Sequence, residues 1–215
     1  MEIAVLGTGA VGRTLAGGLT RIGHQVRIGT RGPDATRRRE EFADLDIPLT
    51  TYDGAVQDAD LVVNATNGQV SLSALGVVGV DLLGDKVILD VANPLDFSHG
   101  FPPTLSVKDS DSLAEQIQRE FPEARVVKAL NTVNAQVMVD PGRVGEGDTS
   151  IFVAGDDASA RSTVIELLRA LGWKDIIEFV VLSGARGMEM WLPLWVGLMG
   201  RLGTADFNLK IIRNE

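Results

Sequence analysis

The sequence predicts a doubly wound, mostly parallel α/β sheet with a small C-terminal helical extension. Short apolar runs alternate with amphipathic stretches along the chain, which is the pattern of repeated strand–helix–strand units. The apolar runs also read as strands that are buried on both faces, as a parallel sheet requires. A length of 215 residues fits one domain with a short appended element. We therefore expect a main domain over residues 1–182 and a helical segment over residues 183–215.

The first half of the chain begins this alternation. Strands are predicted at Glu2–Leu6, Gln25–Gly29, Pro48–Tyr52, Asp60–Ala65 and Lys86–Val91. A helix is predicted over Ala10–Ile22, because apolar residues recur at helical spacing until Gly23 stops it. Asp34 is in position to cap a second helix that runs to about Ala43.

The second half continues the alternation. Ser112 and Glu115 have the spacing of a capping box at the start of a helix. Strands are predicted at Arg125–Leu130, Ser150–Ala154 and Ile176–Val181. Another helix is predicted over Asp157–Leu171. The segment Gly184–Gly203 is strongly apolar, and we expect Pro193 to kink it.

The composition excludes several classes of protein. The chain has 20 basic and 29 acidic side chains and a net charge of −9, which argues against a nucleic-acid partner. The absence of cysteine rules out a disulfide scaffold, a thiolate zinc site and a cysteine nucleophile. The two histidines, His24 and His99, leave few candidates for a metal centre or a catalytic triad. We predict no metal site and no catalytic acid or base, and for His99 we favour a surface loop over a catalytic role.

No membrane-spanning or targeting segment is expected. The most apolar window, Met190–Gly200, is 11 residues long and contains Pro193, so it is too short to cross a bilayer. The chain opens directly into an apolar strand, without a basic region or a cleavable apolar stretch. We therefore expect a cytoplasmic protein with no membrane partner.

The strongest motif is a G-x-G-x-x-G formed by Gly7, Gly9 and Gly12. It follows an apolar strand and opens an amphipathic helix, which is the context of a dinucleotide-binding fingerprint rather than of a merely glycine-rich turn. Gly7 permits the tight turn, Gly9 lets the backbone approach a pyrophosphate, and Gly12 lets helix and strand pack closely. The free N–H groups at the helix start then face the anion.

The end of the second strand indicates which dinucleotide binds. An NAD site usually has an acidic residue there, whereas this chain has Thr30 and Arg31, which suit a 2′-phosphate. Arg37 or Arg38, one turn into the next helix, is in position to supply a second cation. Residues 1–39 hold seven arginines and only two acidic residues, a local basic zone that favours a small anionic ligand. The sequence therefore predicts NADP.

Polar loops follow three of the later predicted strands. They contain Ala65, Thr66 and Asn67, then Asn93 and Pro94, then Asn131 and Thr132. Because ligands of doubly wound sheets bind beyond the carboxyl ends of the strands, we expect these loops to border the nicotinamide ring. Taken singly, each residue is equally suited to capping a helix or a turn.

An ordered set of motifs resembles one family of Rossmann-like proteins. The opening Gly-Thr-Gly-Ala-Val-Gly with Thr30-Arg31 is followed by Lys128-Ala-Leu-Asn-Thr132, Val153-Ala-Gly-Asp-Asp157 and Leu192-Pro-Leu. Over nearly its whole length, the chain resembles the NADPH-dependent reductases of the deazaflavin coenzyme F420. The resemblance implies a Rossmann-like sheet and a C-terminal helical part that helps to form the deazaflavin pocket and a dimer.

The resemblance also implies roles for particular residues. Thr8, Gly9, Ala10 and Val11 would hold the pyrophosphate, Thr30 and Arg31 the 2′-phosphate, and Asn131 and Thr132 would line the ring site. Two positions depart from the archaeal members: Asn131 stands where they have histidine, and Asn67 where they have proline. Both lie near the acceptor, so the resemblance supports NADP more firmly than the deazaflavin.

The implied reaction is hydride transfer between NADP(H) and coenzyme F420. The cofactors carry this chemistry, and the protein supplies stacking and distance, so the lack of a catalytic constellation fits. A ketoreductase would need a proton donor, yet Tyr52 is the only tyrosine and no Tyr-x-x-x-Lys motif exists. Two alternatives remain: an NADPH-dependent reductase of another acceptor, such as a flavin or a small electrophile, and a non-enzymatic NADP-binding sensor.

The C-terminal segment Met188–Leu202 is expected to form an interface and part of the acceptor pocket. It is too apolar for a solvated surface, and such patches usually mark a binding site or an interface. Pairing of two copies would give a C₂ homodimer that includes Trp195. Bending at Pro193 would place Trp191 or Leu192 close to the acceptor.

Overall fold

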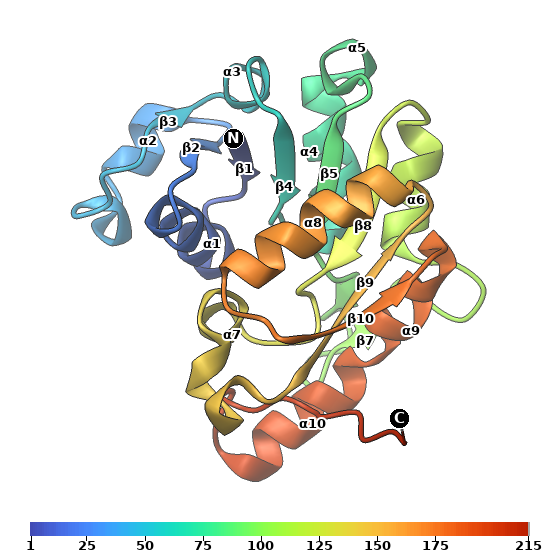
Figure 1. Cartoon of the computed structure of the whole chain (residues 1–215). Helices are drawn as coiled ribbons and strands as arrows, with labels where there is room; N and C mark the ends of the chain where they lie inside the picture. The colour runs from blue at the N-terminus through green and yellow to red at the C-terminus, as the bar shows by residue number, and fades with distance from the viewer. Residues whose placement is uncertain (215) are drawn as a thin grey trace.

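The structure, a computed structural model, describes residues 1–214, and its centre is an eight-stranded sheet (Figure 1). The strands in spatial order are β10 (Asp175–Phe179), β9 (Ser150–Gly155), β8 (Arg125–Ala129), β5 (Val87–Asp90), β4 (Leu61–Asn64), β1 (Glu2–Leu6), β2 (Gln25–Gly29) and β3 (Leu49–Thr50). All neighbours from β3 to β8 are parallel. β9 runs antiparallel to β8, and β10 parallel to β9. The predicted mostly parallel sheet is confirmed.

The strand order changes direction between β1 and β4. The chain moves outward from β1 to β2 and β3, and then returns to the other side of β1 to form β4, β5 and β8. In such sheets a crevice opens where the order reverses, at the carboxyl ends of the parallel strands. This topology predicts a ligand site at the crevice between the carboxyl ends of β1 and β4.

Helices cover both faces of the sheet. One face is covered by α1 (Ala10–Arg21), α7 (Ala135–Val139) and α8 (Ala158–Ala170), and the other by α3 (Tyr52–Val56), α4 (Ser71–Val78), α5 (Val80–Leu83) and α6 (Leu113–Glu120). Alternate strand residues face opposite sides, so Ile3 and Val5 pack into the first core and Ala4 and Leu6 into the second.

The predicted helix from Asp34 to about Ala43 is wrong in its extent. The structure has α2 (Pro33–Arg37), capped by Gly32, followed by the short 3-10 helix η1 (Glu40–Phe42). The backbone between them is extended at Arg39, so that the chain turns and buries Phe42 completely. A buried aromatic ring contributes more than one further helical turn would.

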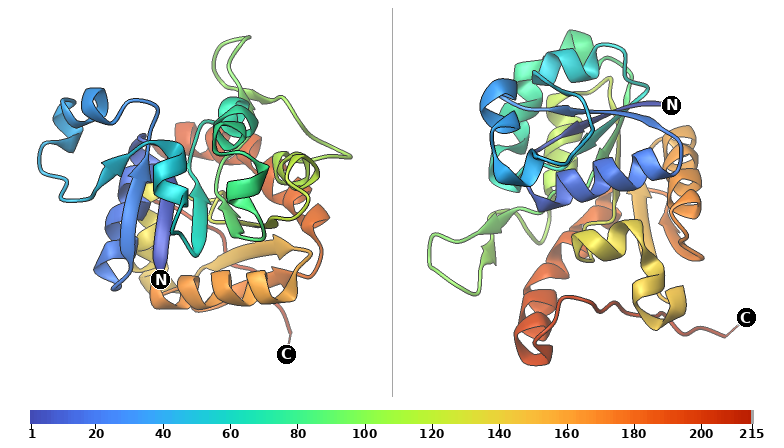
Figure 2. Two further views of the ribbon diagram at one scale, coloured as in Figure 1. Left: turned by 90° about the horizontal axis from the view of Figure 1, so that it is seen from above. Right: turned by 90° about the vertical axis from the view of Figure 1, so that its left-hand side faces the viewer.

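The C-terminal helices lie beyond the carboxyl edge of the parallel strands (Figure 2). The apolar C-terminal segment forms two helices, α9 (Ala185–Met190) and α10 (Leu192–Leu202), which meet at Trp191. Trp191 keeps helical φ and ψ angles, and Pro193 lies in the first turn of α10. Beside them lies a hairpin of β6 (Leu95–Asp96) and β7 (Thr104–Leu105). The remaining elements are the 3-10 helices η2 (Gly68–Val70), η3 (Pro141–Arg143), η4 (Gly145–Gly147) and η5 (Leu182–Gly184). Within residues 1–214, no helix is long and apolar enough to span a membrane.

Candidate functional site

The glycine-rich turn between β1 and α1 is tightly constrained. Gly7 has a φ of +131°, and a Cβ there would lie 2.3 Å from the carbonyl oxygen of Ala65. A Cβ at Gly12 would lie 2.1 Å from the oxygen of Gly7, so the helix packs directly on the turn. Around Gly9, the N-cap of α1, a Cβ would meet nothing within 4 Å, and no side chain caps the helix. The turn therefore presents open space at the start of a helix, where an anion can approach the backbone N–H groups.

Two arginines that sequence reasoning did not single out reach this turn. Arg39 Nη1 donates to Thr8 Oγ1 at 3.0 Å, and Arg13 Nη1 donates to the Thr8 carbonyl at 2.8 Å. Both guanidinium groups also lie over the ring of Phe42, 5.3 and 5.5 Å from its centroid. Glu41 accepts from Arg39 at 2.5 Å. The local excess of arginine in residues 1–39 was the only signal for this cluster.

The residues predicted to bind the 2′-phosphate differ in their exposure and in their hydrogen bonds. Arg31 is exposed after β2, and Thr30 is buried, with its hydroxyl 2.9 Å from that of Thr36. The Arg37 guanidinium donates to the carbonyl oxygens of Leu45 and Ile47, both at 2.9 Å. Arg37 therefore holds the segment after η1, whereas Arg31 forms no ion pair with any of residues 1–214.

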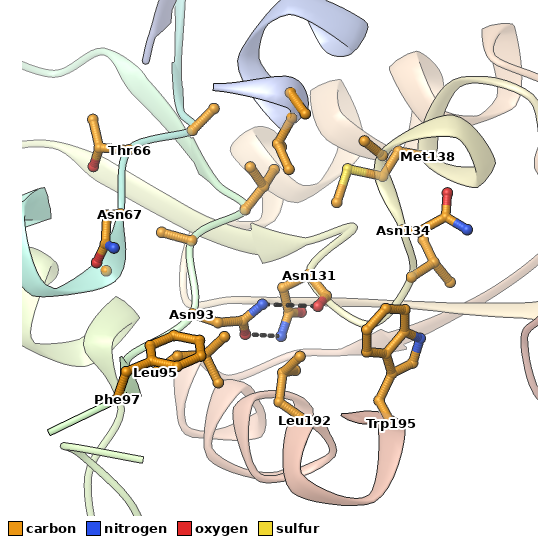
Figure 3. A pocket seen from close by; sticks show the side chains of 18 residues that line it. Thr66, Asn67, Asn93, Leu95, Phe97, Asn131, Asn134, Met138, Leu192 and Trp195 are labelled. Carbon is orange, nitrogen blue, oxygen red and sulfur yellow. Dashed lines mark hydrogen bonds between the residues drawn. The ribbon is translucent and has the colours of Figure 1, made fainter. Parts of the chain in front are cut away.

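A cleft of about 430 Å³ opens at the carboxyl ends of β1, β4, β5 and β8 (Figure 3). The predicted site residues that line it are Ala10, Val11, Ala65, Thr66, Asn67, Asn93 and Asn131. Lining residues that the sequence analysis did not assign to the site include Leu95, Phe97, Asn134, Met138 and Trp195. Phe97 from the β6–β7 hairpin and Trp195 from α10 lie on opposite sides of the cleft (Figure 3).

Asn93 and Asn131 form a reciprocal pair on the cleft wall (Figure 3). Asn93 Nδ2 donates to the Asn131 carbonyl, and Asn131 Nδ2 donates to Asn93 Oδ1, both at 2.9 Å. Asn131 Nδ2 also donates to the Met188 carbonyl at 3.0 Å, which ties α9 to the sheet. Asn131 Oδ1 is buried and has no hydrogen-bond partner within residues 1–214. The pair thus leaves one acceptor unsatisfied beside the cleft.

A buried charged network lies behind this wall. Lys128 Nζ is 2.7 Å from Asp90 Oδ2 and 2.8 Å from Glu189 Oε1, and it also donates to the Ala92 carbonyl. Glu189 accepts from the first N–H groups of α6, those of Leu113 and Ala114. Burial opposes the charged form of Lys128, but attraction by the two carboxylates outweighs it and raises the pKa of Lys128. Burial raises the pKa of the Glu189 carboxyl.

The C-terminal helices supply the remaining wall. Leu192 lines the cleft. The Trp191 indole donates to the Thr132 carbonyl at 3.1 Å and lines a second cavity together with Thr132. Trp195, expected in a dimer interface, stacks on Phe207 with ring centroids 5.3 Å apart. Its indole also borders the cleft.

Neither His99 nor a metal-binding cluster contributes to the cleft among the described residues. His99 lies in the exposed loop of the β6–β7 hairpin, outside the cleft lining. Over the described part of the chain, no cluster of three or more histidine, cysteine, aspartate or glutamate side chains could hold a metal ion.

The fold and the cleft together define a Rossmann-type dinucleotide-dependent oxidoreductase: a glycine-rich turn at the start of α1 leads into a cleft at the topological switch point. The family model described as NADP oxidoreductase, coenzyme F420-dependent, matches residues 2–94. A solved structure of a relative that is 53% identical supports the same assignment over 99% of the chain. The chain belongs to this family, which confirms the resemblance seen in the motifs.

Three relatives illustrate the similarity. A crystal structure of a candidate F420-dependent NADP-reductase from Arthrobacter sp. FB24 is 53% identical, covers 99% of this chain and 100% of its own, and has a TM-score of 0.96. The F420-dependent NADP reductase of Methanocaldococcus jannaschii is 29% identical over 100% of both chains. The metalloreductase STEAP3 of Rattus norvegicus is 28% identical over 90% of this chain, which spans 38% of that longer protein.

Proposed function

We propose that the protein transfers a hydride between NADP(H) and the deazaflavin coenzyme F420 within the cleft. The observation that carries this proposal is the chemistry of the wall: none of the described residues that line the cleft is an acid, a base or a tyrosine. Hydride transfer between two ring carbons needs no protein acid, because the proton that balances it can come from water. Reduction of a carbonyl substrate would need a proton donor here.

We place the pyrophosphate at the turn formed by Gly7, Thr8, Gly9, Ala10, Val11 and Gly12. The open space at Gly9 and the uncapped start of α1 support this placement. At the 2′-phosphate, Thr30 and the exposed Arg31 remain the proposed contacts. For the second cation, Arg39 is better placed than Arg37, because Arg39 already reaches the turn at Thr8 while Arg37 is bonded to backbone carbonyls.

We place the nicotinamide beside Ala65, Thr66, Asn67, Asn93, Pro94 and Asn131, with Thr132 behind them. The unsatisfied Asn131 Oδ1 fits a group that donates a hydrogen bond, and the carboxamide N–H of nicotinamide is such a donor. Phe97 and Trp195 offer aromatic faces on the two sides of the cleft, which suits the flat ring of an acceptor. The protein then acts by holding two rings face to face at a fixed distance.

A second candidate acceptor is a flavin. Its ring has a similar flat shape, and the aromatic side chains of Phe97 and Trp195 suit it equally. Asn131 and Asn67, the two positions that the resemblance puts near the acceptor, both line the cleft. They are the residues through which the choice between the two acceptors would be made.

Steady-state oxidation of NADPH with coenzyme F420, FMN and FAD tests the proposal. We expect fast loss of nicotinamide absorbance with coenzyme F420 and much slower loss with either flavin. NADPH deuterated at C4 should deliver its label to the deazaflavin carbon. Turnover with a flavin and none with coenzyme F420 would show that the second candidate is correct.

The proposal includes a homodimer in the cytoplasm. Apolar side chains of the C-terminal helices remain exposed, among them Met190, Leu194 and Leu202. Leu194→Glu is a better test of pairing than Trp195→Glu, because Trp195 borders the cleft and Leu194 does not. Sedimentation should show a dimer for the unmodified protein and a monomer for Leu194→Glu; a monomeric unmodified protein would refute pairing.

A further inference from the structure

A second cavity, of about 230 Å³, borders Thr132, whereas the preceding residue Asn131 borders the cleft. Its walls come from segments far apart in the sequence: Phe152 of β9, Phe179 of β10, Met188 and Trp191 at α9, and Leu209 of the C-terminal segment. The rings of Phe152 and Phe179 lie 6.2 Å apart and are tilted by 33°. Phe179 is partly exposed, so the cavity can be reached from solvent.

One of the residues that line this cavity has a polar group without a partner. Thr132 is 2% exposed, and its Oγ1 is a buried atom that forms no hydrogen bond in the part of the chain that the structure describes. The Trp191 indole N–H is already used, because it donates to the Thr132 carbonyl. A buried hydroxyl without a partner costs free energy, and a ligand that can hydrogen-bond would remove that cost.

We propose that this second cavity binds a small aromatic molecule of one or two rings that carries a single hydrogen-bonding group. Apolar cavities of about 150 Å³ bind benzene, so this one has room for a somewhat larger ring system. Three aromatic side chains and a methionine match such a ligand in shape and polarity. The Thr132 hydroxyl pairs with the polar group and fixes the orientation of the ring. This site is separate from the proposed hydride transfer and does not depend on it.

Indole is a suitable probe, because it has two rings and one N–H group. Calorimetric titration of the whole protein should give saturable one-to-one binding with a Kd of about 1 mM or tighter. 1-Methylindole, which lacks the N–H group, should bind several-fold more weakly. Thr132→Val keeps the shape of the side chain and removes the hydroxyl. This variant should therefore bind indole and 1-methylindole with similar affinities.

Gly187→Leu blocks the cavity without a steric clash, because Gly187 lines it and a Cβ there would meet nothing within 4 Å. The affinity of this variant for indole should be lower by a factor of at least about ten. Gly197→Leu is the matched control: Gly197 also lies in a C-terminal helix with open space at its Cβ, but outside both cavities. It should bind indole as the unmodified protein does.

Three results would overturn the proposal. The unmodified protein would fail to bind indole at millimolar concentration, or binding would survive Gly187→Leu, or indole would compete with NADPH and so occupy the cleft. A change of oligomeric state in Gly187→Leu, without any indole binding to the unmodified protein, would show that a second copy of the chain fills the cavity. None of these results bears on NADPH oxidation, so the proposed function is tested apart from this site.

Discussion

Lys128 Nζ and Glu189 Oε1 lie 2.8 Å apart, and both side chains are closed off from solvent. The first belongs to the central sheet and the second to α9, so a buried ion pair fastens the C-terminal helices to the carboxyl edge of the sheet. Asp90 completes the network at 2.7 Å from Lys128. The backbone of Ala92, another partner of Lys128, belongs to a residue that lines the cleft. The position of the cleft wall is therefore linked to this buried lysine.

Removing the lysine charge should destabilise the fold strongly. Lys128→Met would leave Asp90 and Glu189 buried without a cation, and breaking a buried ion pair in this way costs about 3–5 kcal/mol of unfolding free energy. Urea denaturation measures the loss. Lys108→Met at an exposed position is the control and should change stability by less than about 0.5 kcal/mol. A loss below about 1 kcal/mol in Lys128→Met would contradict the structural role of this ion pair.

The raised pKa of Glu189 should appear in the pH dependence of stability. Because its pKa in the folded state lies above the ordinary value of 4.5, the folded protein binds more protons than the unfolded chain between those two values. The unfolding free energy contributed by Glu189 therefore falls as the pH rises through that window. We would measure the unfolding free energy of the unmodified protein and of Glu189→Gln from about pH 5 to about pH 8. As the pH rises, the unfolding free energy of the variant should increase relative to that of the unmodified protein. Parallel curves would contradict the raised pKa.

Gly9→Val should separate binding from folding. Open space surrounds Gly9, and its φ of −74° is accessible to valine, so the variant should fold. The added side chain would fill the approach to the backbone N–H groups and weaken NADPH by about a hundredfold or more, which is about 2.7 kcal/mol. Gly7→Val is the contrast, since its positive φ and the contact at 2.3 Å should prevent normal folding. Normal NADPH affinity in Gly9→Val would show that the phosphates bind elsewhere.

Arg31 should decide the choice between NADPH and NADH. We expect the unmodified protein to bind NADPH at least about tenfold more tightly, which is about 1.4 kcal/mol. Arg31→Ala should reduce this ratio by weakening NADPH alone, because only NADPH carries the 2′-phosphate. Arg27→Ala is the control, since Arg27 of β2 is occupied by Glu2 and Asp58. Equal affinities for the two dinucleotides in the unmodified protein would rule out this assignment.

Arg39 and Arg37 are expected to differ when each is replaced by alanine. Arg39→Ala should weaken NADPH binding several-fold, because its guanidinium reaches Thr8 in the turn where we propose that the pyrophosphate binds. Arg37→Ala should mainly lower the unfolding free energy, because it removes two hydrogen bonds to backbone carbonyls. Dinucleotide titration and urea denaturation of both variants would reveal the contrast. The opposite pattern would restore Arg37 as the second cation.

The sequence predicts those features that depend on local chemistry. The turn at Gly7 and Gly12 follows from backbone sterics within a few residues, and the boundary between α9 and α10 just before Pro193 follows from the missing N–H group of that proline. The end of α2 could not be read in this way, because Phe42 turns into a core formed by distant strands. The reversed direction of β9 could not be predicted from the sequence either, because it depends on pairing with β8 rather than on the residues of β9.

The cleft wall shows the same division. Polar loops after the strands were predictable, because strand ends in a parallel sheet share one edge. The contacts of the Trp191 and Trp195 side chains were not predictable, because the direction of each indole depends on how α9 and α10 pack on the sheet. Lys128 reads in the sequence as a charge inside an apolar strand, and its partners in other elements become visible only in the fold.

The two edges of the sheet bear on how readily the protein aggregates. An edge strand offers unpaired N–H and C=O groups to other chains, and natural sheets limit this with short strands or charges. Here β3 has only two residues, while β10 carries Asp175 and Glu178, which form ion pairs with Lys210 and Arg161. Just past β10, however, Val180 and Val181 are exposed without such charges. Under conditions that loosen the fold, intermolecular β-sheet should therefore start at this pair of valines.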